Sequence, residues 1–154
     1  MIPTSTSGFQ MVAEFMTAFN QEIPEEVRMP RLNIRELRDK MTDEEFLETE
    51  YAPDPIHILD GVCDLIYVAM GTALATGFTE QEVKEAFREV HRSNMSKFWR
   101  TEHLDSMQLN WTAKKSGVAG LCIVTNEDGK VVKPASYSPA DIAGVLKKLK
   151  ERVA

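Results

Sequence analysis

The stretch between residues 56 and 76 constrains the fold of this chain more than any other part of the sequence. It is apolar almost all round, yet it contains Asp60 and Asp64, which lie about one helical turn apart. On insertion scales, each of these carboxylates would cost about 2.5–3.5 kcal/mol at the centre of a bilayer. The stretch therefore predicts a buried central helix of a water-soluble protein and not a membrane span.

Helical periodicity continues on both sides of this stretch, over residues 9–20, 33–52 and 79–98. A last helix is expected near the C-terminus, with Ser138 as its cap and Pro139 in its first turn. Residues 121–124 and 131–132 flank an Asn-Glu-Asp-Gly turn and predict a short β-hairpin, whereas residues 100–116 show no clear pattern. The element order predicts a mainly α fold, with a four-helix core bundle, a short C-terminal hairpin and a closing helix.

Charge and length limit the partners that this chain can have. Its 154 residues include 18 Lys and Arg against 24 Asp and Glu, which gives a formal charge of −6. This length suits a single domain over residues 1–154, and a helical core of this size would gain from a partner subunit. The acidity argues against nucleic acid as a partner, because phosphate backbones are bound through Lys and Arg. Residues 1–8 lack a secretory pattern, so we expect a cytoplasmic protein.

Carboxylates occupy positions on two of the predicted helices where apolar residues would be expected. The apolar stripe of residues 33–52 runs on into Glu44, Glu45 and Glu48, and Asp60 and Asp64 interrupt the next helix. Buried together, five carboxylates could not stay ionised without positive charge nearby. All-oxygen ligands favour Mg²⁺ or Mn²⁺ over Zn²⁺. A solvated acidic face is the alternative, and for the three glutamates taken alone it is the better interpretation.

The helix over residues 79–98 supplies groups of the opposite kind. Its apolar stripe leads to Asn94 and Lys97, which place an amide and an ammonium where core residues would be expected. Both side chains can bind phosphate oxygens. Taken alone, Lys97 could equally be a surface residue whose stem covers the core.

Several motifs resemble the MazG-like all-α NTP pyrophosphohydrolases, in particular the dimeric, dUTPase-related and phosphoribosyl-ATP pyrophosphohydrolase-like branch. These motifs are EExxE at residues 44–48, DLIYV at 64–68, EVHRSNMSK at 89–97 and GKVVKPASYSPADI at 129–142. The opening FQMVAEFMTAF at 9–19 is similar to the first helix of that branch. The resemblance covers most of the chain outside residues 100–126.

The resemblance implies Mg²⁺- or Mn²⁺-dependent hydrolysis of nucleoside triphosphates, dUTP among them, to monophosphate and pyrophosphate, as nucleotide-pool house-cleaning. It implies a homodimer, or a dimer of dimers. It assigns the metal to Glu44, Glu45, Glu48 and Asp64, with Glu44, Glu45 and Lys97 as catalytic residues. Gly61 stands where the family has a further Glu, and Asp60 would take over that ligand role. Phosphate binding falls to Asn94, Lys97, Lys130, Lys133 and Tyr137.

Base recognition is assigned to the first helix. Phe15 and Phe19 could stack on a base, while Gln10 and Asn20 could read its polar edge. Two alternatives to the enzyme remain open. One is a catalytically impaired nucleotide sensor, which the missing Glu at Gly61 favours. The other is a helical interaction protein whose apolar stripes form a dimer core.

Overall fold

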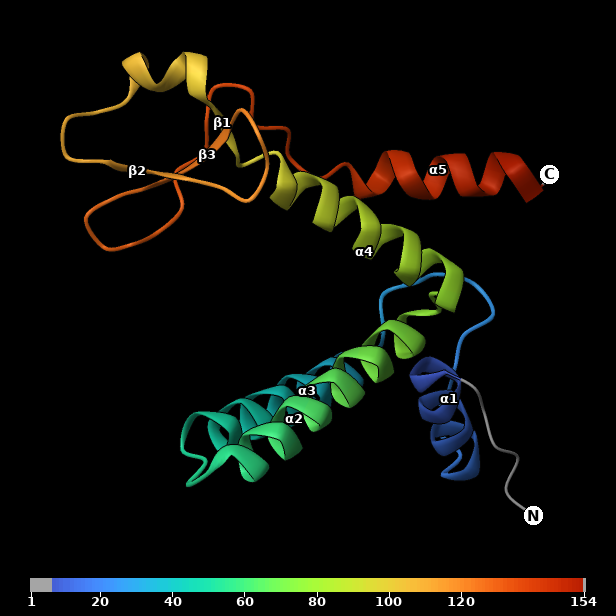
Figure 1. The fold of residues 1–154 in the computed structure, drawn as a ribbon. Coiled ribbons are helices and arrows are strands. Elements are labelled where there is room, and N and C mark those ends of the chain that lie inside the picture. Colours follow the sequence, from blue (N-terminus) through green and yellow to red (C-terminus); the bar gives the residue numbers. More distant parts are fainter. Residues whose placement is uncertain (1–6, 154) are drawn as a thin grey trace. The chain divides into compact units, whose positions relative to one another are not determined.

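The computed structural model describes residues 7–153, which fold into two compact units that meet between Val83 and Lys84 in the sequence. The fold is mainly α, as predicted, with a small sheet and a closing C-terminal helix (Figure 1). The helices expected within residues 9–98 are confirmed, with ends that move by a few residues. The expectation of one domain over residues 1–154 stays a prediction.

The first unit contains α1 (Gly8–Ala18), α2 (Leu32–Glu50) and α3 (Pro55–Thr76), and α4 (Glu80–Met95) begins at its end. Local chemistry sets the ends of α3. The Asp54 carboxylate accepts hydrogen bonds from the backbone N–H groups of Ile56 and His57, and Gly77 ends the helix at a φ of 89°. The core lies between α1 and the last turns of α3, and it consists of Phe9, Val12, Met16, Leu74 and Ala75.

Helices α2 and α3 lie side by side and approach most closely at two glycines of α3 (Figure 1). A Cβ atom placed on Gly61 would lie 3.2 Å from the Cα of Thr49. One placed on Gly71 would lie 3.2 Å from the Cζ of Arg38. Because these contacts are with backbone in one case and with a buried side chain in the other, neither position can take a larger residue without displacing its neighbour. We call this contact the α2–α3 seam.

The expectation that α3 is buried all round is wrong for the single chain. The helix is long and apolar enough to cross a membrane, and only 28% of its most apolar window is buried. Leu59 and Ile66 are at least half exposed. The reason is that α1 and α2 cover only part of its circumference.

The second unit contains the rest of α4, then β1 (Trp99–Arg100), a 3₁₀ helix (Thr101–Ser106), β2 (Thr112–Lys115), β3 (Leu121–Thr125) and α5 (Ile142–Val153). The three strands form an antiparallel sheet in the order β1-β3-β2. Its core consists of Trp99, Cys122 and Val124. The indole N–H of Trp99 donates to the Val132 carbonyl at 2.9 Å, and Trp111 packs edge-on against the Trp99 ring.

The predicted hairpin is present in a reduced form. Beyond the Asn126–Gly129 turn, the return strand is a single bridge between Thr125 and Val131. The main partner of β3 is instead β2, which lies in the segment that showed no clear pattern. Strand β2 escaped prediction because it is short and its side chains are mostly exposed, so it lacks a clean alternation of apolar and polar residues.

The predicted start of the last helix is wrong, because hydrogen bonds to α4 hold the preceding segment outside the helix. Arg92 donates to the Pro139 carbonyl at 3.0 Å, and the Ser138 N–H donates to Ser96 Oγ at 3.0 Å. Glu89 accepts from the Asp141 N–H at 2.9 Å. Helix α5 therefore begins at Ile142, where the Asp141 carboxylate accepts from the Gly144 N–H. We call the contacts of α4 with residues 138–141 the tail clamp.

Enlarging Gly61 should destabilise the first unit. A Gly61→Ala substitution pushes a methyl group against the Thr49 backbone, and overpacking of this kind costs about 1–3 kcal/mol, against about 1 kcal/mol gained in helix propensity. The free energy of unfolding, measured by urea titration with circular dichroism, should fall. Gly117→Ala is the control, since nothing lies within 4 Å of the added atom. Equal stability of both variants would contradict the tight seam.

The tail clamp should weaken in acid. Hydrogen bonds from Arg92 and from the Asp141 N–H lower the pKa of Glu89 to about 2, below its ordinary value. The ionised carboxylate therefore stabilises the fold above about pH 4.3, and this contribution disappears as the pH falls toward 2. When unfolding in urea is followed by tryptophan fluorescence, Glu89→Gln should therefore lower the midpoint more at pH 7 than at pH 3. Glu127→Gln removes an equal charge from an exposed turn and serves as the control. If Glu89→Gln lowered the urea midpoint by the same amount at pH 7 and at pH 3, this role of Glu89 would be contradicted.

Candidate functional site

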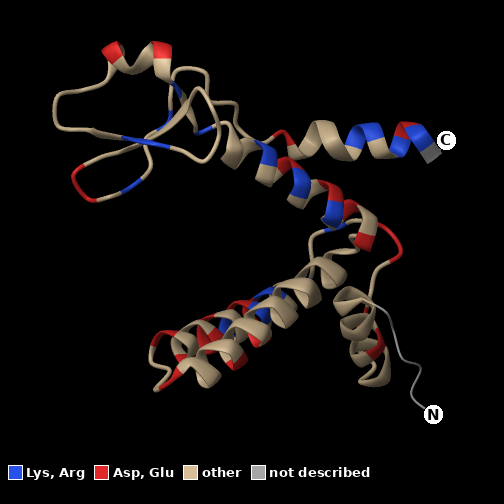
Figure 2. Cartoon of the chain, viewed as in Figure 1, with Lys and Arg blue, Asp and Glu red and all other residues tan. Residues whose placement is uncertain are grey.

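The predicted acidic residues of α2 and α3 come together across the α2–α3 seam. Glu45 is half-buried on α2, and burial raises the pKa of its carboxyl group. The negative charges of four neighbouring carboxylates raise this pKa further. Asp64 has the largest effect, followed by Glu48, Glu44 and Asp60. Figure 2 shows the acidic positions concentrated along this pair of helices. The structure therefore gathers all five predicted acids into one region of negative potential, which we call the acidic group.

The acidic group has no balancing cation within the described part of the chain. None of the ion pairs between residues 7–153 uses one of its five carboxylates. The expectation that these carboxylates are buried is wrong for the single chain: four of the side chains are exposed and Glu45 is half-buried, because α2 and α3 leave this part of their surfaces uncovered. Hard oxygen ligands with unbalanced negative charge suit a divalent cation such as Mg²⁺.

The side-chain positions are those of an open site. Among residues 7–153, no three His, Cys, Asp or Glu side chains converge closely enough to hold a metal ion. The other four carboxylates are close enough to raise the pKa of Glu45, but the five are not drawn around one point. Mutual repulsion of like charges accounts for this spread, and a cation would reverse it.

Packing explains why Gly61 departs from the family pattern. The position is buried and faces Thr49, so a Glu there would collide with α2. Asp60 precedes it and is exposed, and its carboxylate is one of those that raise the Glu45 pKa. Asp60 is therefore available to the acidic group, whereas position 61 forms part of the seam.

The second unit brings together most of the predicted phosphate-binding residues. Lys97 Nζ donates to the Asn94 side-chain oxygen at 2.7 Å, and Lys133 Nζ lies 4.4 Å from the centre of the Tyr137 ring. Ser93 Oγ donates to the Tyr137 hydroxyl at 3.2 Å. That hydrogen bond, followed by the charges of Lys133 and Lys97, lowers the pKa of Tyr137. These residues form a compact polar group with excess positive charge, which we call the lysine group.

Ser93 was missed by sequence reasoning. It is buried in α4 and directs the Tyr137 hydroxyl, and its position directly before Asn94 in the EVHRSNMSK motif was the available signal.

Lys130 differs from the other residues that were predicted to bind phosphate. Its backbone N–H closes the turn on the Asn126 side chain, and no described contact joins its side chain to the lysine group.

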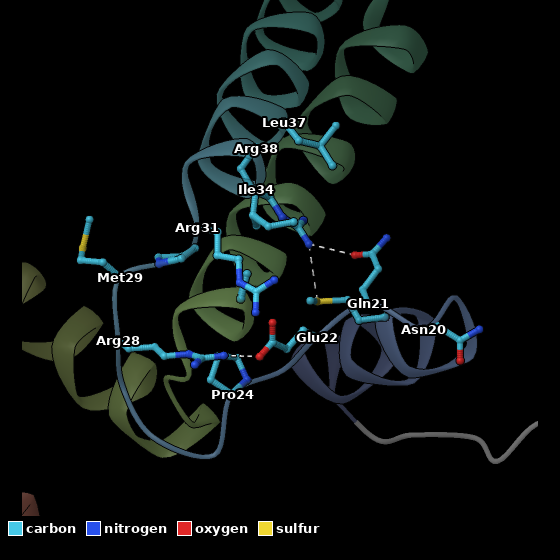
Figure 3. Close-up of a pocket in the computed structure, with 13 residues that line it drawn as sticks. Asn20, Gln21, Glu22, Pro24, Arg28, Met29, Arg31, Ile34, Leu37 and Arg38 are labelled. Carbon is cyan, nitrogen blue, oxygen red and sulfur yellow. Dashed lines mark hydrogen bonds and ion pairs between the residues drawn. The ribbon is translucent and has the colours of Figure 1, made fainter.

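The residues predicted to bind the base are only partly brought together. Phe15 and Phe19 stack with ring centres 4.3 Å apart, and Tyr67 of α3 meets Phe15 edge-on at 5.8 Å. Tyr67 was not predicted, although it lies one turn after Asp64. Gln10 projects about 140° around α1 from Phe15, so it does not join this aromatic group. Asn20 has a φ of 54° and lies beside a separate cavity (Figure 3).

Comparison with protein families finds a match over residues 12–94, just over half of the chain, to the model described as phosphoribosyl-ATP pyrophosphohydrolase. No curated protein matches the chain. The matched region includes the whole acidic group and ends at Asn94 of the lysine group.

Enzymes of this description act on phosphoric anhydride bonds. The match fits the resemblance that the motifs indicated. The chain therefore belongs to the phosphoribosyl-ATP pyrophosphohydrolase family, and it is a hydrolase of the nucleotide pyrophosphohydrolase type.

Proposed function

We propose that this protein is a Mg²⁺- or Mn²⁺-dependent nucleoside triphosphate pyrophosphohydrolase of the nucleotide pool. Its substrates would be ribo- or deoxyribonucleoside triphosphates, dUTP among them, and its products a nucleoside monophosphate and pyrophosphate. The observation that carries the proposal is the gathering of five carboxylates on α2 and α3, close enough for the other four to raise the pKa of Glu45, with none of the five ion-paired within residues 7–153. The family match supports hydrolysis of a phosphoric anhydride in general.

The proposal gives each polar group a separate task. Glu44, Glu45, Glu48, Asp60 and Asp64 would hold the metal. The bound ion would supply positive charge to the polyphosphate and acidify a water molecule. Glu45 is the half-buried member of the group, and where it is not fully used as a metal ligand its carboxylate could orient the attacking water or accept its proton. Glu44, which is exposed beside it, could share this task.

The lysine group would bind phosphate oxygens. Lys97 and Lys133 carry the positive charge, and Asn94 already accepts a hydrogen bond from Lys97, which orients both side chains. Ammonium groups that are in place before the reaction stabilise the charge that develops on phosphoryl oxygens. Ser93 and Lys133 would hold Tyr137 at this group. The stacked pair Phe15 and Phe19 offers an exposed aromatic surface for a base.

Gly61 favours one second candidate. Because the seam leaves no room for the family's Glu at this position, the metal would rely on the shorter Asp60. A chain with this substitution could bind nucleotides without rapid turnover and act as a sensor. Turnover across a panel of triphosphates with Mn²⁺ distinguishes the sensor from the enzyme.

Removing one charge from the acidic group should abolish turnover. Glu48→Gln or Asp64→Asn should lower Mn²⁺-dependent pyrophosphate release by more than about 100-fold, because each removes a metal ligand without changing core volume. Asp43→Asn is the matched control, since it removes an α2 charge outside the acidic group. Circular dichroism should show unchanged helix content. Full activity in both ligand variants would refute the metal assignment, and an inactive wild type that Mn²⁺ still stabilises would indicate the sensor.

We also propose that the protein is a homodimer, alone or as a dimer of dimers. Leu59, Val62 and Ile66 lie three to four residues apart on one face of α3 and are 63%, 38% and 50% exposed. A second copy of this helix would cover that face, and a bilayer is a poorer occupant because α3 also carries Asp60 and Asp64.

A charge on this face should separate the subunits. Analytical ultracentrifugation of the wild type should give about twice the chain mass of 17.4 kDa, or about four times for a dimer of dimers, and Ile66→Glu should lower this mass because it disrupts the α3 contact. Leu109→Glu is the control, because Leu109 is fully exposed in the second unit. A wild type that sediments as a monomer at all concentrations would exclude the dimer.

A further inference from the structure

The first unit contains a cavity of about 390 Å³ that lies outside the acidic group. The end of α1, the segment that leads to α2, the first turns of α2 and Ala75 of α3 form its walls (Figure 3). Small-molecule sites in proteins usually have volumes of about 300–1,000 Å³. Met16, Ile34 and Leu37 give the cavity an apolar lining, and three arginines give it charge.

Arg38 is the most unusual member of this lining. Arg38 is one of the two buried polar or charged residues in the described part of the chain, and 9% of its surface is exposed. One terminal nitrogen donates to the Gln21 side-chain oxygen at 3.0 Å and lies 3.6 Å from the Met16 sulfur, as Figure 3 shows. Its buried Nε has no hydrogen-bond partner among residues 7–153. No ion pair within that range includes Arg38, so a carboxylate does not balance its charge.

Arg31 provides a second cation at the same cavity. It is the N-cap residue of α2, and its side chain makes no capping hydrogen bond. The first turn of α2 contains no acidic residue, so the partial positive charge of the helix N-terminus is also unbalanced there. Arg28, by contrast, is paired with Glu22. In a chain of net charge −6, this cavity therefore carries three arginines against one glutamate.

A buried guanidinium is costly unless a counter-charge is present, and residues 7–153 supply none that is paired with Arg38. We propose that the cavity binds a small organic anion, in which a phosphate or carboxylate group sits on an apolar body. Arg38 and Arg31 bind the oxyanion, because a guanidinium can pair with it through two parallel hydrogen bonds. Met16, Ile34 and Leu37 contact the apolar body. Arg38 precedes Glu45 by seven residues on the same face of α2, so the site lies about 10 Å along the helix from the acidic group.

Calorimetric titration of the full chain without divalent metal tests this site with three matched probes: phenyl phosphate, benzoate and benzyl alcohol. We expect at least one of the two anions to bind and the neutral alcohol not to bind. The tighter of the two anions identifies the natural ligand as a phosphate or as a carboxylate. Failure of both anions to bind at millimolar concentration, or equal binding of benzyl alcohol, would overturn the proposal.

Two variants locate the binding. Arg31→Gln should weaken anion binding by about tenfold or more without unfolding the chain, because Arg31 is exposed. Arg38→Met should remove binding and leave the melting temperature of the ligand-free protein unchanged or higher, because a buried unpaired charge is replaced by an apolar side chain of similar length. Arg35→Gln is the control, since this exposed arginine of α2 does not line the cavity.

Lys133→Gln separates this site from the lysine group, which could also bind a phosphate. Binding that is lost in Lys133→Gln and kept in Arg31→Gln would place the anion in the second unit and overturn the proposal. The outcome does not depend on catalysis, because no metal is added and no turnover is measured.

Discussion

The close approach of α2 and α3 is the constraint on which the rest of the first unit depends. Two glycines of α3 allow it, with Thr49 packed on Gly61 and Arg38 packed on Gly71. The same approach places the carboxylates of the two helices near each other, so the geometry of the acidic group follows from backbone packing. It also leaves no room for a larger side chain at position 61, where the resemblance to the family led us to expect a Glu.

The seam holds charge of both signs that no ion pair among residues 7–153 neutralises. Toward one end, four carboxylates raise the pKa of Glu45, and about 10 Å along α2 the guanidinium of Arg38 is buried without an acidic partner. A domain of this size is only marginally stable, so unbalanced charge near the core is a substantial cost. Bound ions and ligands of opposite charge are the physical means of recovering that cost, which makes both places candidates for binding sites.

The second unit shows how one motif can serve folding and chemistry together. Glu89, Arg92 and Ser96 hold the segment before α5, while Ser93, Asn94 and Lys97 lie at the lysine group. Successive residues of a helix point in different directions, so the charged positions of this motif divide between the two tasks. The clamp also explains the late start of α5, since Ser138 and Pro139 are fixed by α4 and cannot enter a helix.

The sequence by itself determined the helices, the mainly α class and the two polar groups, because periodicity and the placement of charge on apolar stripes are local properties. It indicated that Glu45 and Asp64 lie near each other and that Asn94 and Lys97 belong to one polar group, which the structure confirms; their roles in catalysis and binding stay predictions. Only the tertiary structure decided the roles of Gly61, Ser93, Tyr67 and Arg38, and the pairing of β2 with β3. These depend on which residues meet across long separations in the chain. Local patterns do not encode such meetings, because burial and close approach arise only when the elements pack.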